Sequence, residues 1–331
     1  MLNPELFLNQ NVFNEDVEKQ PTRDGFGKGL VKAGEKNKNI VALTADLKES
    51  TRIEEFANKF PERFFEVGVA EQNLITIAAG LANSNKIPFA SSYATFSPGR
   101  NWEQIRTTVC YNNVNVKIIG AHAGLLTGPD GVTHQATEDL ALMLSLPNMK
   151  VVVPVDYYEA YKATLEIAKI NSPCYLRLSR PKIPVITTEK TPFEFNKIQT
   201  FWISPNPQVT IIATGSMVYY SLIAAQQLEK QGIETEVINC STLKPLDKEE
   251  ILKHFKITKA AVTVEEHQTH GGLSSLIANL ITTNFLIPQE IVAIDDTFSE
   301  SGDPEELLDK YGLNTDNIKK AVLKAISRKK Q

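Results

Sequence analysis

The strongest constraint on how this chain can fold is a repeated alternation of short, apolar, β-rich runs with longer amphipathic stretches. Apolar strands separated by amphipathic helices are typical of a mostly parallel sheet with helices on both faces. In the first block the pattern predicts strands at 39–46, 64–69, 88–96, 115–122, 150–155 and 174–179. It predicts helices there at 23–36, 51–59, 70–83, 101–109, 136–144 and 157–170.

A second, smaller block repeats the pattern after an irregular stretch rich in proline, which is typical of a linker between domains. Its predicted strands are 209–214, 235–239, 261–265 and 291–294, and its predicted helices are 217–230, 248–256, 273–282, 304–310 and 315–327. We therefore expect two doubly wound α/β domains. The expected division is an N-terminal extension (1–14), a first domain (15–185), a linker (186–206) and a smaller second domain (207–331).

Composition argues against several classes of protein. The chain has 35 basic and 39 acidic residues, a net charge of −4 and no basic stripe, which disfavours nucleic-acid binding. Three scattered cysteines without a CxxC pair disfavour a disulfide framework or a cysteine zinc site and fit a reducing compartment. No apolar run reaches the length of a membrane span, and the first residues do not read as a signal peptide. We expect a cytoplasmic protein that binds neither nucleic acid nor membranes.

Glu71 occupies an informative position in the stretch Gly-Val-Ala-Glu-Gln-Asn (68–73). It follows a strand-like run and enters an apolar helix, and such corners of open α/β sheets present groups to ligands. A carboxylate in an apolar surround is costly unless something pairs with it, and burial would raise its pKa so that it carries a proton. The alternative interpretation is a first-turn glutamate stabilised by the helix dipole.

Other predicted strands also end in polar or aromatic side chains. Asp46 can reach a ligand or, like Ser50, cap the next helix. Phe96 can stack on a flat ligand or pack in the core. Arg180 ends the last strand of the first block, where an arginine can bind a phosphate or form a surface ion pair.

The run 122–135 is the most specific, because it places His122, Asp130, His134 and three glycines in one loop after a strand. Glycines permit a tight loop that exposes backbone groups, and such loops often carry binding residues. Histidine and aspartate can bind hydroxyl, carbonyl or phosphate groups. The spacing matches no common zinc pattern, so we predict no metal site here. A turn with His267 and His270 in the second block is either structural or faces the space between the domains.

Taken together, these runs resemble the transketolase family of thiamine-diphosphate enzymes. The matching text covers nearly the whole chain and includes FFEVGVAEQN, GLLTGPDGVTHQATEDLALM, STLKPLD, VEEHQTHGGL and DTFSESGDPEELLDKYGL. It corresponds to the C-terminal half of a transketolase and is most similar to the second subunit of a split transketolase. The resemblance therefore implies a pyrimidine-binding domain followed by a smaller transketolase C-terminal domain.

The resemblance also implies how the chain holds its cofactor, thiamine diphosphate. Glu71 corresponds to the glutamate that hydrogen-bonds the aminopyrimidine ring, and Phe96 to the aromatic residue that stacks on that ring. Asp46 corresponds to an acid near the thiazolium ring that also contacts the donor ketose. Full-length enzymes carry further aromatic residues after the Phe96 equivalent, and here Trp102 is the plausible replacement.

The substrate residues follow from the same resemblance. Asp130 and His134 correspond to groups that bind donor hydroxyls and assist proton transfer, so they join Glu71 as catalytic candidates. A set of four residues corresponds to the site for the terminal phosphate of the sugar: Arg23, Ser50, His122 and Arg180. The implied activity is transfer of a two-carbon ketol unit from a ketose phosphate to an aldose phosphate.

The chain departs from the family in lacking the GDG motif that, with a distant asparagine, holds magnesium or calcium against the cofactor diphosphate. Gly302 and Asp303 are followed by Pro304, so they do not supply it. A hard cation needs oxygen ligands from elsewhere. We therefore expect a separate N-terminal-type transketolase subunit that carries the metal site, in an α2β2 assembly with two self-associated copies of this chain at its centre.

Three other readings remain open. They are a half of a 1-deoxyxylulose-5-phosphate synthase-like enzyme, the β subunit of a 2-oxo-acid dehydrogenase, and a non-catalytic partner that only stabilises an enzyme. The phosphate-binding set favours transketolase over the first two. The joint presence of Glu71, Asp46, Asp130 and His134 argues against the third.

Overall fold

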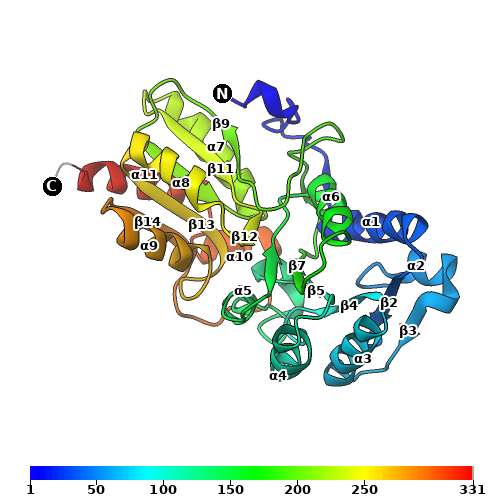
Figure 1. The fold of residues 1–331 in the computed structure, drawn as a ribbon. Helices are drawn as coiled ribbons and strands as arrows, with labels where there is room; N and C mark the ends of the chain where they lie inside the picture. The colour runs from blue at the N-terminus through cyan, green and yellow to red at the C-terminus, as the bar shows by residue number, and fades with distance from the viewer. Residues whose placement is uncertain (330–331) are drawn as a thin grey trace.

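The structure, a computed structural model that describes residues 1–329, contains two open sheets flanked by helices (Figure 1). The first sheet has the strand order β12-β6-β7-β5-β4-β2-β3 and is parallel except where the edge strand β12 pairs with β6. Its strands are β2 (Ile40–Thr44), β3 (Phe64–Glu66), β4 (Ile87–Tyr93), β5 (Lys117–Ala121), β6 (Lys150–Val152), β7 (Cys174–Arg177) and β12 (Thr242–Lys244). Every residue of β2 is buried, as expected for a strand covered on both faces.

Alternate side chains of a strand face opposite sides of a sheet, and β2 shows both cores. Ile40 and Ala42 pack with Phe26 under α1 and α6, whereas Val41 and Leu43 pack in the cluster under α3 and α5. The helices of this part are η1 (Pro4–Leu6), α1 (Thr22–Lys36), α2 (Glu54–Lys59), η2 (Pro61–Arg63), α3 (Glu71–Asn83), η4 (Leu125–Asp130), α5 (Asp139–Leu144) and α6 (Tyr157–Ile167).

One predicted helix has an unexpected form. The stretch 101–109 was expected to be α-helical, but it begins as the short α4 (Trp102–Gln104) and continues as a π-helix, η3 (Ile105–Tyr111). A π-helix widens the turn, and such segments are frequent near functional sites.

The second sheet has the order β14-β13-β10-β11-β9, with only β9 antiparallel to its neighbour. Its strands are β9 (Gln199–Trp202), β10 (Val209–Ala213), β11 (Thr235–Asn239), β13 (Ala261–Gln268) and β14 (Gln289–Ile294). Its helices are α7 (Met217–Glu229), α8 (Lys248–Thr258), α9 (Leu273–Asn284), α10 (Pro304–Lys310) and α11 (Thr315–Arg328). The predicted α/β class is confirmed. No helix within residues 1–329 is long and apolar enough to cross a membrane.

Two segments depart from the division expected from the sequence. The expected linker, 186–206, contains β9, which pairs with β11 of the second sheet, so the irregular part ends before Gln199. The strand β12 lies in the second half of the chain but extends the first sheet, and the Val153 N–H donates to the Ser241 carbonyl at 2.7 Å. The second half of the chain therefore completes the sheet of the first.

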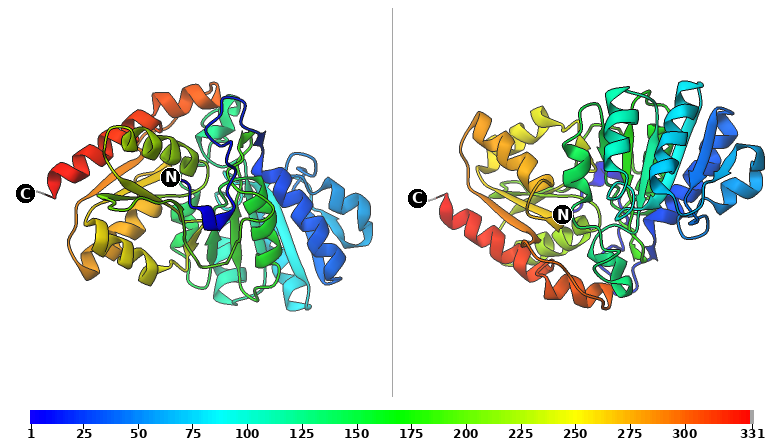
Figure 2. Two further views of the ribbon diagram at one scale, coloured as in Figure 1. Left: turned by 90° about the horizontal axis from the view of Figure 1, so that it is seen from above. Right: turned by 90° about the horizontal axis from the view of Figure 1, so that it is seen from below.

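The first residues also bridge the two halves. Leu2 pairs with Trp202, and the Asn9 N–H donates to the Ile186 carbonyl at 2.8 Å. Leu8 and Val12 are buried in the core of the second sheet. The N-terminal segment crosses this region in dark blue in the left view of Figure 2. A short two-stranded sheet, β1 (Lys19–Gln20) with β8 (Ile183–Pro184), closes the same region.

A buried carboxyl group joins α6 to the second sheet. Glu159 lies in α6, and its carboxyl accepts hydrogen bonds from the Val155 N–H and, at 2.7 Å, from the Asn239 side-chain amide. Burial raises the pKa of Glu159 to about 8, although both hydrogen bonds favour the charged form. At neutral pH this interdomain contact is therefore made mainly by a protonated carboxyl group.

The pH dependence of folding tests this contact. Because the folded-state pKa of Glu159, about 8, exceeds the ordinary value of 4.5, the folded chain retains a proton that the unfolded chain releases. Its contribution to stability is therefore complete below about pH 4.5 and is lost as the pH rises through about 8. We expect the free energy of unfolding to fall over this range by up to about 1.4 kcal/mol per pH unit, and Glu159→Gln to remove this component.

Urea unfolding of both proteins between about pH 5 and pH 8 measures the effect. Glu166→Gln, a substitution on the exposed side of the same helix, is the control and should keep the wild-type slope. Equal slopes for wild type and Glu159→Gln would contradict the assignment.

Candidate functional site

Most of the candidate residues gather at the carboxyl edge of the first sheet. Parallel strands end at one edge, so residues that follow different strands meet there although they are far apart in the chain. Four of them follow β2, β4, β5 and β7, in that order: Asp46, Phe96, His122 and Arg180. Glu71 begins α3 after β3.

Glu71 is buried, with 2% of its surface exposed, and it is paired with a cation that the sequence did not predict. Arg100 Nη1 donates to Glu71 Oε2 at 2.8 Å. The same guanidinium lies over the Phe96 ring, 4.7 Å from its centroid. Asn101 donates from its side-chain amide to the Glu71 carbonyl at 2.9 Å and fixes the start of α3. The apolar surround of Glu71 is therefore completed by a planar cation, which offsets the cost of burying the carboxylate.

A single helical turn brings Phe96 and Arg100 together. The Arg100 N–H donates to the Phe96 carbonyl at 2.9 Å, and residues four apart on such a turn share a face. A Cβ at Gly99 would lie 2.0 Å from the Thr95 carbonyl oxygen, so only glycine fits there. The four-residue spacing in the sequence was the available signal for Arg100.

Trp102 does not join this group. Its indole N–H donates to the Leu142 carbonyl at 2.9 Å, and its ring packs on the core under α3 and α5. Both the polar and the apolar parts of the side chain are used in packing. The structure thus shows a packing role for Trp102, and its contact with the cofactor stays a prediction.

His122 is held as a neutral ring between Tyr93 and Arg23. Its ring centroid lies 4.0 Å from that of Tyr93, and its Nε2 lies 3.2 Å from Arg23 Nη1. Burial, followed by the charges of Arg23 and Arg180, lowers the pKa of His122 to about 3. Arginine can only donate, so His122 Nε2 is the acceptor and Nδ1 carries the proton.

Unpaired donors and positive charge mark the same place. His122 Nδ1 and Arg23 Nε are buried without hydrogen-bond partners within residues 1–329. Arg23 also donates to the Ser50 carbonyl at 2.9 Å, so Arg23 contacts the backbone of Ser50 and not its side-chain hydroxyl. Burial and the nearby charge of Arg52 lower the pKa of Arg23. An anion placed here would offset this repulsion.

Arg180, Asp130 and His134 lie around the loop that follows β5. Arg180 Nη1 donates to the Thr127 carbonyl at 3.0 Å and lies 3.7 Å from Asp130 Oδ1. The His134 ring meets the Phe96 ring edge to face at 5.4 Å, and its Nδ1 lies 2.9 Å from the Thr133 hydroxyl. His134 and Arg100 thus contact the same ring, that of Phe96.

Asp46 is exposed at the end of β2, and its side chain makes no hydrogen bond to the other candidates within residues 1–329. Its backbone has a left-handed φ of 59° and is held by Glu66, whose Oε1 accepts from the Asp46 N–H at 2.8 Å. Glu66 was not predicted. Among residues 1–329, no three His, Cys, Asp or Glu side chains are grouped closely enough to hold a metal ion.

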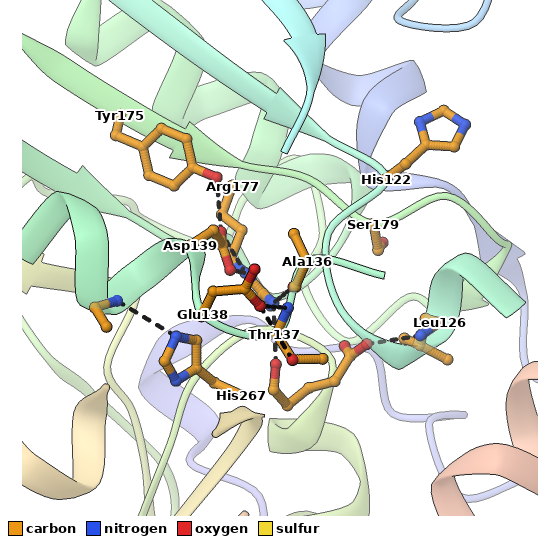
Figure 3. Close-up of polar contacts among 12 residues, drawn as sticks. His122, Leu126, Ala136, Thr137, Glu138, Asp139, Tyr175, Arg177, Ser179 and His267 are labelled. Carbon is orange, nitrogen blue, oxygen red and sulfur yellow. Dashed lines mark hydrogen bonds and ion pairs between the residues drawn. The ribbon is translucent and has the colours of Figure 1, made fainter. Parts of the chain in front are cut away.

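The two histidines of the turn in the second domain, His267 and His270, differ in their burial. His267 is fully buried, and its Nε2 accepts from the Ala141 N–H of α5 at 3.3 Å (Figure 3). His270 is exposed. Of the two alternatives left open by the sequence, His267 therefore has a structural place at the contact between the domains.

Comparisons with known proteins decide the family. Residues 18–185 match the model of the transketolase pyrimidine binding domain, and residues 202–318 match that of the transketolase C-terminal domain. The chain belongs to the transketolase family. It is 42% identical to a putative transketolase C-terminal section from Methanocaldococcus jannaschii, over 92% of this chain and 96% of that protein.

Two further transketolase relatives match over almost their whole length. One is the 6-deoxy-6-sulfo-D-fructose transketolase subunit SqwH of Clostridium sp. (strain MSTE9), 36% identical over 96% of this chain and 98% of that protein. The other is a solved structure described as a split gene transketolase, inactive beta4 tetramer, with a TM-score of 0.85, 42% identity, and coverage of 93% of this chain and 99% of that chain. The predicted family and its two domains are confirmed.

The ion pair of Glu71 and Arg100 can be measured with a double-mutant cycle. Arg100→Ala leaves a buried carboxylate without its cation, so we expect it to lower the free energy of unfolding. Because the Arg100 side chain is 51% exposed, the expected coupling with Glu71→Gln is about 1 kcal/mol, well below that of a fully buried pair. Arg106→Ala, on the exposed side of the following turn, is the control, and additive effects of the two site substitutions would contradict the pairing.

The protonation of His122 can be observed directly by NMR. With a pKa of about 3, we expect the ring to stay neutral between about pH 5 and pH 8, with its proton on Nδ1. Nitrogen-15 shifts of the imidazole report both the charge and the tautomer, and the spectrum of His122→Gln assigns the signal. Titration near pH 6.5, or a proton on Nε2, would contradict the geometry.

Proposed function

We propose that this chain is one subunit of a split transketolase, which moves a two-carbon ketol unit from a ketose phosphate to an aldose phosphate with thiamine diphosphate. The observation that carries the proposal is the buried carboxylate of Glu71 near the partly buried ring of Phe96, with Arg100 contacting both. Glu71 Oε1 has no hydrogen bond within residues 1–329 and is open to a ring nitrogen. These groups fit the pyrimidine half of the cofactor.

The cofactor, when bound, supplies the carbanion chemistry of ketol transfer, and the protein controls protons and position. Glu71, which is itself buried, would hold a proton at the ring nitrogen of the pyrimidine. Phe96 would support the ring face, and Asp46 would lie near the thiazolium and the donor ketose. Asp130 and His134 would bind donor hydroxyls and exchange protons with them.

The terminal anion of the sugar would lie among Arg23, Ser50, His122 and Arg180. The two unpaired N–H donors on Arg23 and His122 support this assignment, because each lacks a partner that a bound anion would supply. The neutral state of His122 would make it a hydrogen-bond donor rather than a second charge. A relative named for 6-deoxy-6-sulfo-D-fructose supports sugars with a terminal anion as the substrate class.

The magnesium or calcium ion and the cofactor diphosphate would be held by a separate N-terminal-type subunit, in an α2β2 assembly. Relatives that match over almost their whole length are named as a C-terminal section or a subunit, which supports a divided enzyme. A structural relative described as an inactive beta4 tetramer supports both self-association of such a subunit and its need for a partner.

Turnover of xylulose 5-phosphate and ribose 5-phosphate tests the proposal. We expect activity with thiamine diphosphate and magnesium only when the chain is mixed with its GDG-containing partner subunit. Glu71→Gln should lower the rate about a hundredfold or more, because it removes the proton carrier. Glu166→Gln, a surface substitution on α6, is the matched control and should retain the rate.

Three outcomes would decide against the proposal. Full activity of the chain without a partner would exclude the divided site. An unchanged rate in Glu71→Gln would favour a non-catalytic stabilising role. Consumption of pyruvate in place of ketose phosphate by the mixture would favour a 1-deoxyxylulose-5-phosphate synthase-like or 2-oxo-acid dehydrogenase-like enzyme.

A further inference from the structure

We propose that Glu266, in the second domain, is a positioning residue for the substrate loop of the first domain. The substrate loop is the segment 124–136, which carries Asp130 and His134 and follows His122. The consequence for turnover rests on the proposed function, whereas the contact itself does not.

The carboxylate of Glu266 crosses from one domain to the other. Glu266 lies on β13 with 4% of its surface exposed, and its Oε1 accepts the Leu126 N–H of the substrate loop at 2.8 Å. Its Oε2 accepts the Ser216 hydroxyl of the second domain at 3.0 Å. Figure 3 labels Leu126, and the dashed line at its N–H marks this hydrogen bond. Both oxygens are thus used, one for each domain.

The fit between this carboxylate and the loop requires a glycine. A Cβ at Gly124, where φ is +79°, would lie 2.2 Å from Glu266 Oε1. Gly128 and Gly131 show the same relation, because their Cβ atoms would meet Pro304 at 2.9 Å and the Ser301 hydroxyl at 2.3 Å. The glycines of the substrate loop therefore serve its close packing against the second domain. The sequence had suggested exposure of the backbone to a ligand instead.

Arg177 holds the base of the loop and the backbone of Glu266 together. Its Nη2 donates to the Ala136 carbonyl at 3.3 Å and to the Glu266 carbonyl at 3.0 Å. Its Nε donates to both carboxylate oxygens of Asp139, at 3.1 and 3.0 Å. These buried groups lie at the centre of Figure 3. Arg177 thus fixes the backbone of Glu266 relative to the loop. A substitution at position 266 can therefore change the contact between its side chain and Leu126 while the contacts of its backbone remain.

Leu126 is adjacent in the chain to Thr127, which contacts two of the proposed substrate residues, His122 and Arg180. Thr127, the next residue, donates from its hydroxyl to the His122 carbonyl at 2.6 Å and accepts at its own carbonyl from Arg180. If the carboxylate is withdrawn, the Leu126 N–H is left buried without a partner, which is unfavourable. We expect the loop to move toward water and to displace the groups that bind the sugar anion.

Shortening the side chain by one methylene isolates the effect. Glu266→Asp keeps charge and burial but draws the carboxylate back from Leu126, while Glu266→Gln keeps the length and one acceptor oxygen. Glu265→Asp is the matched control. Glu265 is also buried, at the preceding position of β13, but its carboxylate accepts the Leu273 and Ser274 N–H groups at the start of α9.

Hydrogen exchange of the purified chain gives the first readout. In Glu266→Asp we expect amides of 124–131 to exchange about tenfold faster or more, since about 1.4 kcal/mol corresponds to a factor of ten. Glu266→Gln should stay close to wild type, and Glu265→Asp should change the start of α9 alone. Unchanged loop exchange in folded Glu266→Asp, or equal loop exchange in Glu265→Asp, would overturn the proposal.

The assembled enzyme gives the second readout. In Glu266→Asp we expect the KM for the ketose phosphate to rise about tenfold while kcat changes much less, with recovery in Glu266→Gln. A fall in kcat alone would overturn the positioning role. If the wild-type mixture turns over no ketose phosphate, the proposed function fails, but the exchange experiment still decides whether Glu266 positions the loop.

Discussion

The buried ion pair of Arg177 and Asp139 is the interaction on which the arrangement of this molecule depends. Their side chains are 7% and 1% exposed, and burying two charges is favourable only if every donor and acceptor is satisfied. Tyr175 donates its hydroxyl to Asp139 at 2.6 Å, and Arg177 Nη2 donates to backbone carbonyls of both domains. A guanidinium presents several donors in a fixed plane, so it can hold three segments at once. The sheet, the substrate loop and the second domain are fixed around this one group.

The site at the edge of the first sheet contains two buried ionisable groups, His122 and Glu71, whose charges are handled in opposite ways. Around His122, several cations are held close together, and the ring stays neutral because burial and like charge disfavour its protonation. Around Glu71 the opposite applies, because the buried carboxylate is paired with Arg100 over the Phe96 ring. Positive potential and unpaired donors thus lie on one side, and a paired acid lies on the other. This polarity suits a ligand with an anionic end and a ring that needs a proton partner.

Local patterns in the sequence were sufficient for the elements but not for their contacts. The predicted strands 209–214 and 235–239 correspond closely to β10 and β11, and every residue of both strands is buried, as expected for strands covered on both faces. The short edge strands β9 and β12 were missed, since an edge strand of three or four residues carries little periodicity. An aromatic ring beside a site and one in the core have the same sequence signal, so the sequence did not reveal that Trp102 packs on the core under α3 and α5. Arg100 was missed because its partner, Glu71, lies 29 residues away.

The sequence by itself determined the α/β class, the transketolase family and the order of candidate residues along the strand ends. These properties follow from hydrophobic periodicity and from sequence motifs, and both can be read from short stretches of the chain. The tertiary structure decided that β12 completes the first sheet, that Arg100 pairs with Glu71, and that Glu266 meets the substrate loop 140 residues away. Such contacts depend on how two domains pack and on which buried groups must find partners there. No stretch of sequence contains that information alone, because each partner satisfies its hydrogen bonds only when the whole chain is folded.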